Sequence, residues 1–118
     1  MADVTIYHNP GCSKSRGALE ILRERGIDAE VIEYLTSPPS RASIERCVAL
    51  LPDAPAELVR HDKRFRELGL DESAFTSAEE VVGLLLDHPE LMQRPIVIRG
   101  DRAVIARPSD RVEELLED

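Results

Sequence analysis

The opening of the chain contains the feature that most restricts its possible folds, a helical pattern enclosed by two strand patterns. The segments "VTIY" and "AEVIEY" are rich in β-branched and aromatic residues, which favour strands. Between them Ala18, Ile21 and Leu22 recur at helical spacing, and Gly26 marks the end of that helix. Strands joined by a helix pair most simply in parallel, through a right-handed crossover. The sequence therefore predicts an α/β fold that starts with a βαβ unit.

The rest of the chain predicts a helical insertion, a β-hairpin and a C-terminal helix. "TSPPS" ends the βαβ unit. "TSAEEVVGLLLDHP" predicts a helix that begins at Ser77, because Glu80 completes a capping-box pattern. "RPIVIRGDRAVIAR" indicates two strands around a short turn, and a last helix follows. With 118 residues and no linker or repeat, we expect one domain over residues 1–118, with the helical insertion at about 40–92.

Composition and charge argue against several classes of function. The net charge of -8 argues against a general nucleic-acid binder, since such proteins hold the phosphate backbone largely through Lys and Arg. No apolar run approaches the roughly 20 residues of a membrane span, and the first residues lack the pattern of a signal peptide. Both cysteines, Cys12 and Cys47, are expected to be reduced. We therefore expect a cytoplasmic protein with no membrane or nucleic-acid partner.

The two cysteines have different surroundings. Cys12 lies between the first strand and the first helix, where unpaired N–H groups, the helix dipole and the cations of Lys14 and Arg16 favour a thiolate. Such settings lower the pKa of a cysteine from about 8.5 to roughly 3.5–7.5, so Cys12 is a candidate nucleophile. Cys47 lies instead on the apolar face of a predicted helix, which is typical of a buried structural cysteine.

Several ordered motifs resemble the glutaredoxin-dependent arsenate reductases of the thioredoxin-like superfamily. They are "TIYHNPGCSKSR", a tyrosine and "TSPPS" after the second strand, "LVRHD…ELGL", "HPELMQRPIVI" and "ARPSD". The resemblance implies a thioredoxin-like fold and a nucleophilic Cys12. It also implies that three arginines bind the oxyanion, and the matching positions are Arg60, Arg94 and Arg107. In such folds the proline that opens the third strand, here Pro95, is typically cis.

The charge of arsenate explains why arginines would be needed. Arsenate is an oxyanion that is mostly doubly charged near neutral pH, so an approaching thiolate is repelled. Arginine keeps its charge and presents a fixed fork of donors that binds two oxygens at once. Arg94 and Arg107 each precede a proline at an end of the predicted hairpin, where the fold could bring both to the thiol. By position alone, Arg64 or Arg66 could take the place of Arg60.

His8 and Ser15 are secondary candidates near the thiol. Ser15 could donate a hydrogen bond to the Cys12 thiolate, or it could cap the helix. His8 could orient the loop or tune Cys12, or it could be a turn histidine bonded to the backbone. His61 and His88 have no cysteine partners at metal-ligand spacing, so no metal site is expected. Phosphate-loop and dinucleotide patterns are missing, and no tightly bound cofactor is expected.

These features together predict an arsenate reductase in which Cys12 attacks arsenic and forms a thiol–arsenate adduct. The resemblance implies that glutathione, as a co-substrate, then reduces the adduct, and that glutaredoxin sustains turnover. Two alternatives stay open. An Spx-type transcription regulator uses the same fold to bind RNA polymerase, but often carries C-x-x-C where this chain has Ser15. A glutathione-dependent thiol-transfer protein would use Cys12 without needing the arginines.

Overall fold

Four strands form one mixed sheet in the computed structural model, which describes residues 4–116. In chain order the strands are Val4–His8 (β1), Ala29–Glu33 (β2), Ile96–Arg99 (β3) and Arg102–Ile105 (β4). β1 pairs with β2 in parallel and with β3 antiparallel, and β3 pairs with β4 antiparallel. The order is therefore β2-β1-β3-β4, which confirms the predicted parallel pair and hairpin. Residues 1–3 and 117–118, the ends of the predicted domain, lie outside the described residues.

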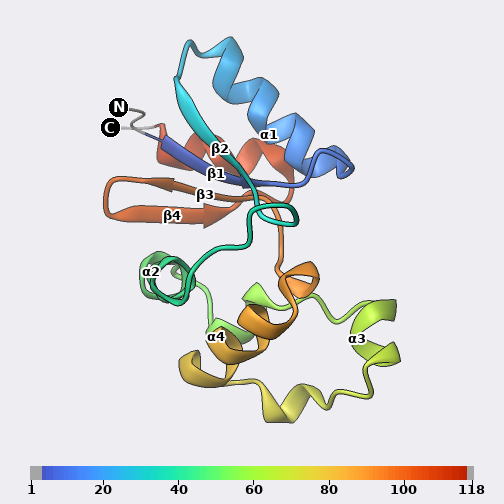
Figure 1. The fold of residues 1–118 in the computed structure, drawn as a ribbon. Helices are drawn as coiled ribbons and strands as arrows, with labels where there is room; N and C mark the ends of the chain where they lie inside the picture. The colour runs from blue at the N-terminus through green and yellow to red at the C-terminus, as the bar shows by residue number, and fades with distance from the viewer. Residues whose placement is uncertain (1–3, 117–118) are drawn as a thin grey trace.

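Helix α1 (Ser13–Glu24) makes the crossover from β1 to β2 and covers one face of the sheet (Figure 1). Its buried face includes Ala18 and Leu22, in agreement with the predicted helical spacing. The helix ends where predicted because Gly26 adopts φ +68°, a left-handed conformation that glycine takes without steric cost.

The C-terminal segment lies beside α1 on the same face of the sheet, but it is not the regular α-helix that the sequence suggests. Residues Ser109–Leu115 form a 3-10 helix, η4. Its two buried side chains, Val112 and Leu115, are three residues apart, a spacing that aligns them on one side of a 3-10 helix. The Ser109 hydroxyl donates to the carbonyl of Lys14 at 2.8 Å and so fixes η4 to the first turn of α1.

The helices between β2 and β3 cover the opposite face of the sheet (Figure 1). Ser77 and Glu80 form the predicted capping box at the start of the fourth α-helix. Between the second and fourth α-helices the chain is less regular, with one five-residue α-helix and two 3-10 turns. The elements are α2 (Arg41–Leu50), η1 (Pro55–Leu58), α3 (Lys63–Glu67), η2 (Glu72–Ala74), α4 (Ala78–Asp87) and η3 (Pro89–Leu91).

The alternation of side chains along the strands divides the core in two. Val97 of β3 packs with α1 and η4, whereas its neighbours Ile96 and Ile98 pack with the helical insertion. Cys47 is fully buried in the second of these clusters, as its place on an apolar helix face predicts. Burial raises the pKa of the Cys47 thiol to about 11, so this cysteine stays protonated. No helix within residues 4–116 has the length and apolarity needed to cross a membrane.

Candidate active site

Cys12 occupies the N-terminal end of α1, at the exit of a short loop that follows β1. The backbone N–H of Cys12 donates to the carbonyl of Asn9 at 3.0 Å, which closes a turn. Within that turn the Asn9 side chain accepts from the N–H of Gly11 at 2.9 Å. Cys12 itself is extended, at φ -104° and ψ 125°, while its carbonyl already accepts from Arg16 at 3.0 Å. This is the geometry of a residue that begins a helix, so the sulfur lies at the positive end of the helix dipole.

The surroundings of Cys12 favour the thiolate. Partial burial raises the pKa of the thiol, but the backbone N–H groups of Ser15 and Lys14 and the nearby guanidinium of Arg94 outweigh it. The pKa falls from 9.0 to about 6. At that value about nine-tenths of the thiol is ionised at pH 7, against about one-hundredth at a pKa of 9. The thiolate form of Cys12 is therefore favoured, and Arg94 contributes to this.

Arg94 and Arg107 reach the thiol from the two ends of the hairpin. Each precedes a cis proline, so Pro95 has the isomer that the family resemblance implies, and Pro108 has it as well. Nη1 of Arg107 lies 3.9 Å from the Cys12 sulfur and donates to the carbonyl of Arg94 at 2.9 Å. The hairpin thus holds both guanidinium groups beside the thiol.

Arg60 is brought to the same region by a small pairing that the sequence does not reveal. Val59 forms an isolated antiparallel bridge with Met92. Next to it, the N–H of Arg60 donates to the carbonyl of Leu91 at 2.7 Å. The segment around Arg60 therefore runs beside the segment that leads into Arg94.

Arg60 and Arg64, one of the residues that could take its place by position, form different ion pairs. Nη1 of Arg60 lies 3.1 Å from a carboxylate oxygen of Asp62. Arg64, which has a similar position in the sequence, pairs instead with Glu90 at 3.0 Å. The charge of Arg60 acts on the hydroxyl of Tyr34, as do the charges of Arg94 and Cys12. Arg60 and Arg94 therefore both act on the same tyrosine hydroxyl.

Ser15 is fully buried under the Cys12 loop. Its hydroxyl oxygen accepts from the N–H of Asn9 at 3.4 Å, across the base of the loop. The group of Ser15 that acts on the thiol is its backbone N–H. The serine side chain thus holds the loop.

His8 is the last residue of β1 and not a turn residue, because β1 extends one pair further along β2, as far as His8 opposite Glu33. The ring is buried, and its Nδ1 has no hydrogen-bond partner among residues 4–116. Burial lowers the pKa of the imidazole, so the ring is neutral at physiological pH. The charged groups that act on the ring are Glu33 of β2 and Arg23 and Arg16 of α1. His8 thus faces α1 and not the Cys12 thiol.

Tyr34 is a neighbour of this site that sequence reasoning did not single out as a site residue. It follows β2 directly, and its side chain is 1% exposed. The hydroxyl lies beside the Arg94 guanidinium, and burial raises the pKa of the phenol. Its position in the sequence could have indicated this. Glu33 pairs with His8 in the parallel strands, so Tyr34 leaves β2 at the same edge as the loop that carries Cys12.

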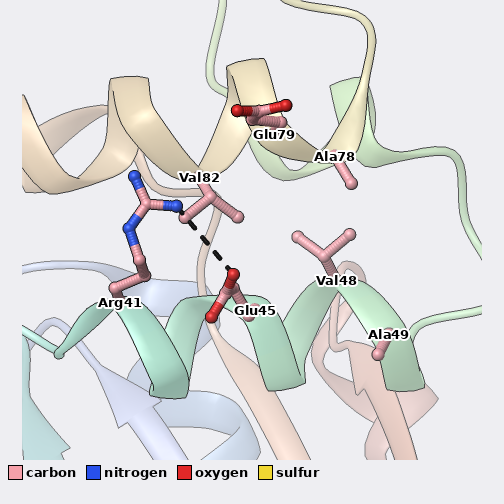
Figure 2. A pocket seen from close by; sticks show the side chains of 7 residues that line it. All are labelled: Arg41, Glu45, Val48, Ala49, Ala78, Glu79 and Val82. Carbon is pink, nitrogen blue, oxygen red and sulfur yellow. Dashed lines mark ion pairs between the residues drawn. The ribbon is translucent and has the colours of Figure 1, made fainter.

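A separate hollow lies between α2 and α4 and has a volume of about 450 Å³ (Figure 2). Its charged residues include Arg41 and Glu45, which form an ion pair at 3.9 Å. None of the predicted site residues lines it. Within the described part of the chain, no three His, Cys, Asp or Glu side chains are grouped as they would be around a metal ion.

Comparison with known proteins identifies the family. The sequence model of the ArsC family matches residues 7–115. The arsenate reductase of Neisseria meningitidis serogroup A is 39% identical over 118 residues, which cover 98% of this chain and 100% of that protein. An arsenate reductase of Escherichia coli is 40% identical over 119 residues, covering 100% of this chain and 84% of that protein.

The fold comparison agrees with the sequence comparison. The structure of the arsenate reductase from Vibrio cholerae superimposes with a TM-score of 0.85 at 35% identity, and the match covers 96% of this chain and 97% of the other. The predicted α/β fold of the thioredoxin-like superfamily is thereby confirmed. From the match over residues 7–115 and these relatives, the chain belongs to the ArsC family.

Proposed function

We propose that this protein is an arsenate reductase in which Cys12 is the nucleophile and Arg60, Arg94 and Arg107 bind the oxyanion. The observation that carries the proposal is the group around the sulfur. A thiol with a pKa of about 6 lies 3.9 Å from the Arg107 guanidinium and beside that of Arg94. A thiolate among permanent cations is suited to attack an anionic electrophile. The relatives named above, at about 40% identity, are arsenate reductases.

In the first step the Cys12 sulfur attacks arsenic in dihydrogen arsenate, the singly charged form that exchanges one proton with the doubly charged form near neutral pH. An S–As bond forms and one As–O bond breaks. The departing hydroxide takes the remaining proton of the arsenate and leaves as water, so that arsenic stays in the +5 state. The guanidinium groups of Arg94 and Arg107 offset the charge that gathers on the arsenate oxygens. Arg60 contributes a third cation from the insertion.

The electrons come in the next steps from thiols outside the chain. Reduction of As(V) to As(III) takes two electrons, which two thiols supply when they join in one disulfide. Their two protons go to the Cys12 sulfur and to an arsenic oxygen as the S–As bond breaks, so arsenite leaves and the Cys12 thiol is restored. Cys47 is poorly suited to be one of them, since it is fully buried and its pKa is about 11. We therefore infer that glutathione is the co-substrate and that glutaredoxin sustains turnover. A cytoplasmic location, where thiols are kept reduced, fits this requirement.

Pro95, Ser15 and His8 would support the reaction from below the site, by shaping the loop and the hairpin end that carry the reacting groups. We also infer that residues 1–118 act as one domain, because both hydrophobic clusters share the single sheet. The guanidinium groups of Arg94 and Arg107 beside the thiol favour an oxyanion substrate over the alternative of plain thiol transfer, which needs Cys12 alone.

The test compares the two cysteines in an arsenite-production assay with glutathione and glutaredoxin. Cys12→Ser is expected to abolish turnover, because the alcohol stays protonated. Cys47→Ser should keep the chemistry and lose only stability, through its effect on packing. Equal loss in both folded variants, together with a Cys12–Cys47 disulfide during turnover, would show that Cys47 resolves the adduct and that the proposed route is wrong.

A further inference from the structure

Two of the unpaired polar groups in the interior meet at the proposed active site. Within residues 4–116, the buried side-chain atoms without a hydrogen-bond partner are Nδ1 of His8, the hydroxyl of Tyr34 and Nε of Arg94. A buried donor left unsatisfied typically costs about 1–3 kcal/mol, so such atoms are uncommon and call for an explanation. The Tyr34 hydroxyl and the Arg94 guanidinium lie side by side. The Arg94 guanidinium is close enough to act on the Tyr34 oxygen as a donor, although this hydroxyl makes no hydrogen bond of normal geometry within residues 4–116. The Tyr34 O–H proton therefore stays available to a ligand bound beside both groups.

The sheet explains why Tyr34 lies there. β2 runs parallel to β1, with Glu33 opposite His8, so the carboxyl ends of both strands meet at one edge of the sheet. The residue that follows each strand therefore lies at that edge, Tyr34 after β2 and Asn9 at the start of the Cys12 loop. The antiparallel β3 begins at the same edge, since Ile96 pairs with Tyr7. Arg94 lies two residues before Ile96 and is thus on the same side.

The Tyr34 ring is packed in the hydrophobic core, and its hydroxyl lies among charged side chains. The ring belongs to the hydrophobic cluster of the insertion side, with Ile44 of α2 and Ile96 of β3. Arg94, Arg60 and Cys12 are the charged or ionisable groups that act on the hydroxyl. Burial raises the pKa of the phenol, so it keeps its proton at neutral pH and acts as a donor.

We propose that Tyr34 is a further catalytic residue, whose hydroxyl donates a hydrogen bond to an oxygen of the arsenate held at Cys12, beside the guanidinium of Arg94. This inference rests on the proposed function, since it assumes that the oxyanion binds between the thiol and the arginines. The phenol adds a neutral donor to three cations. It does so from a rigid ring, so little conformational freedom is lost on binding.

The matched pair of variants is Tyr34→Phe and Tyr7→Phe. Tyr7 is buried to a similar degree, at 5% exposure, and belongs to the same hydrophobic cluster. Its hydroxyl lies near Ser43 and Cys47 instead of the arginines. Both substitutions remove one buried hydroxyl and keep the ring, so they differ in whether that hydroxyl faces the proposed oxyanion.

Two measurements are made on each variant, the arsenate concentration that protects Cys12 from alkylation by iodoacetamide, and kcat/KM for arsenite production. Tyr34→Phe should weaken protection and lower kcat/KM by about 10-fold or more, the loss expected for a hydrogen bond to a charged group. Tyr7→Phe should keep both within twofold. Without arsenate, Tyr34→Phe should melt close to the wild type, since the lost hydroxyl makes no hydrogen bond of normal geometry among residues 4–116. Arsenate should then raise the melting temperature of the wild type more than that of Tyr34→Phe.

Wild-type protection and wild-type kcat/KM in Tyr34→Phe would overturn the proposal. An equal loss in both variants would also overturn it, because the effect would then come from packing. The proposed function fails in a different way. If arsenate protects Cys12 in the wild type but no arsenite is produced, the reductase assignment is wrong, and the protection assay still decides whether Tyr34 binds the oxyanion.

Discussion

Removal of the Arg94 charge offers the sharpest test of how this site activates its thiol. The pKa of Cys12 lies about 3 units below its ordinary value, at about 6 against 9.0. The N–H groups of Ser15 and Lys14 and the Arg94 side chain share this shift and also overcome the effect of burial. A nearby opposite charge is worth about 1–3 units. Arg94→Gln, which keeps a side chain of similar length, should therefore raise the pKa of Cys12 by about 1 unit.

The assay is the rate of alkylation by iodoacetamide between pH 4 and pH 9, followed by mass spectrometry of the peptide that contains Cys12. The wild type should show a midpoint near pH 6. In Arg94→Gln the midpoint should lie near pH 7, so that about half of the thiol is ionised at that pH instead of about nine-tenths. Cys47 provides an internal reference, since its pKa of about 11 leaves it unreactive in this range.

Arg64→Gln is the matched control, because Arg64 pairs with Glu90 and not with the thiol. Its midpoint should equal that of the wild type. A folded Arg94→Gln whose midpoint moves by less than about 0.3 unit would refute the reasoning and leave the helix N-terminus as the main cause of the shift.

The lowered pKa of Cys12 also makes the stability of the protein depend on pH. The unfolded thiol binds its proton more tightly, so the contribution of Cys12 to stability is complete above about pH 9 and is lost as the pH falls through about 6.

Two further substitutions test other contacts of the same region. Arg107→Ala should lower the rate of arsenite production by about 10²–10³-fold, the usual loss for one preorganised charge-stabilising donor, whereas Arg23→Ala should leave it within twofold. Gly17→Ala places a Cβ 2.6 Å from the Ser109 hydroxyl oxygen, so the bond from Ser109 to α1 has to shift. In urea unfolding this variant should be less stable than the wild type, although alanine is the better helix former by about 1 kcal/mol. Equal or higher stability would mean that η4 moves freely on α1.

Most of the fold can be predicted from local patterns in the sequence. The crossover helix with its stop at Gly26, the capping box of Ser77 and Glu80 and the hairpin all depend on residues close together in the chain, and all are found in the structure. The form of the last helix was not predictable in this way. Its 3-10 geometry depends on Val112 and Leu115 packing against α1, which lies far away in the sequence.

The same contrast between local and long-range contacts decides which parts of the site could be predicted. The position of Cys12 at the start of a helix follows from a strand, a turn and a helix in direct succession. The place of Arg60 depends on the bridge between Val59 and Met92, which no local pattern indicates. The place of His8 could not be predicted because the sequence does not fix the end of β1. One additional residue pair makes His8 a buried strand residue instead of a loop residue.

The sheet also explains how the proposed site has its charges in place before any substrate arrives. Cys12 follows β1, while Arg94 and Arg107 lie just outside the two ends of the hairpin. The Arg107 guanidinium donates to the backbone carbonyl of Arg94, and the Ser109 hydroxyl donates to the carbonyl of Lys14 in the first turn of α1. Movement of the Arg107 guanidinium away from the sulfur would therefore break its hydrogen bond to the segment that leads into β3. Donors held in this way stabilise developing charge without reorganising during the reaction, which is the condition under which electrostatic stabilisation is most effective.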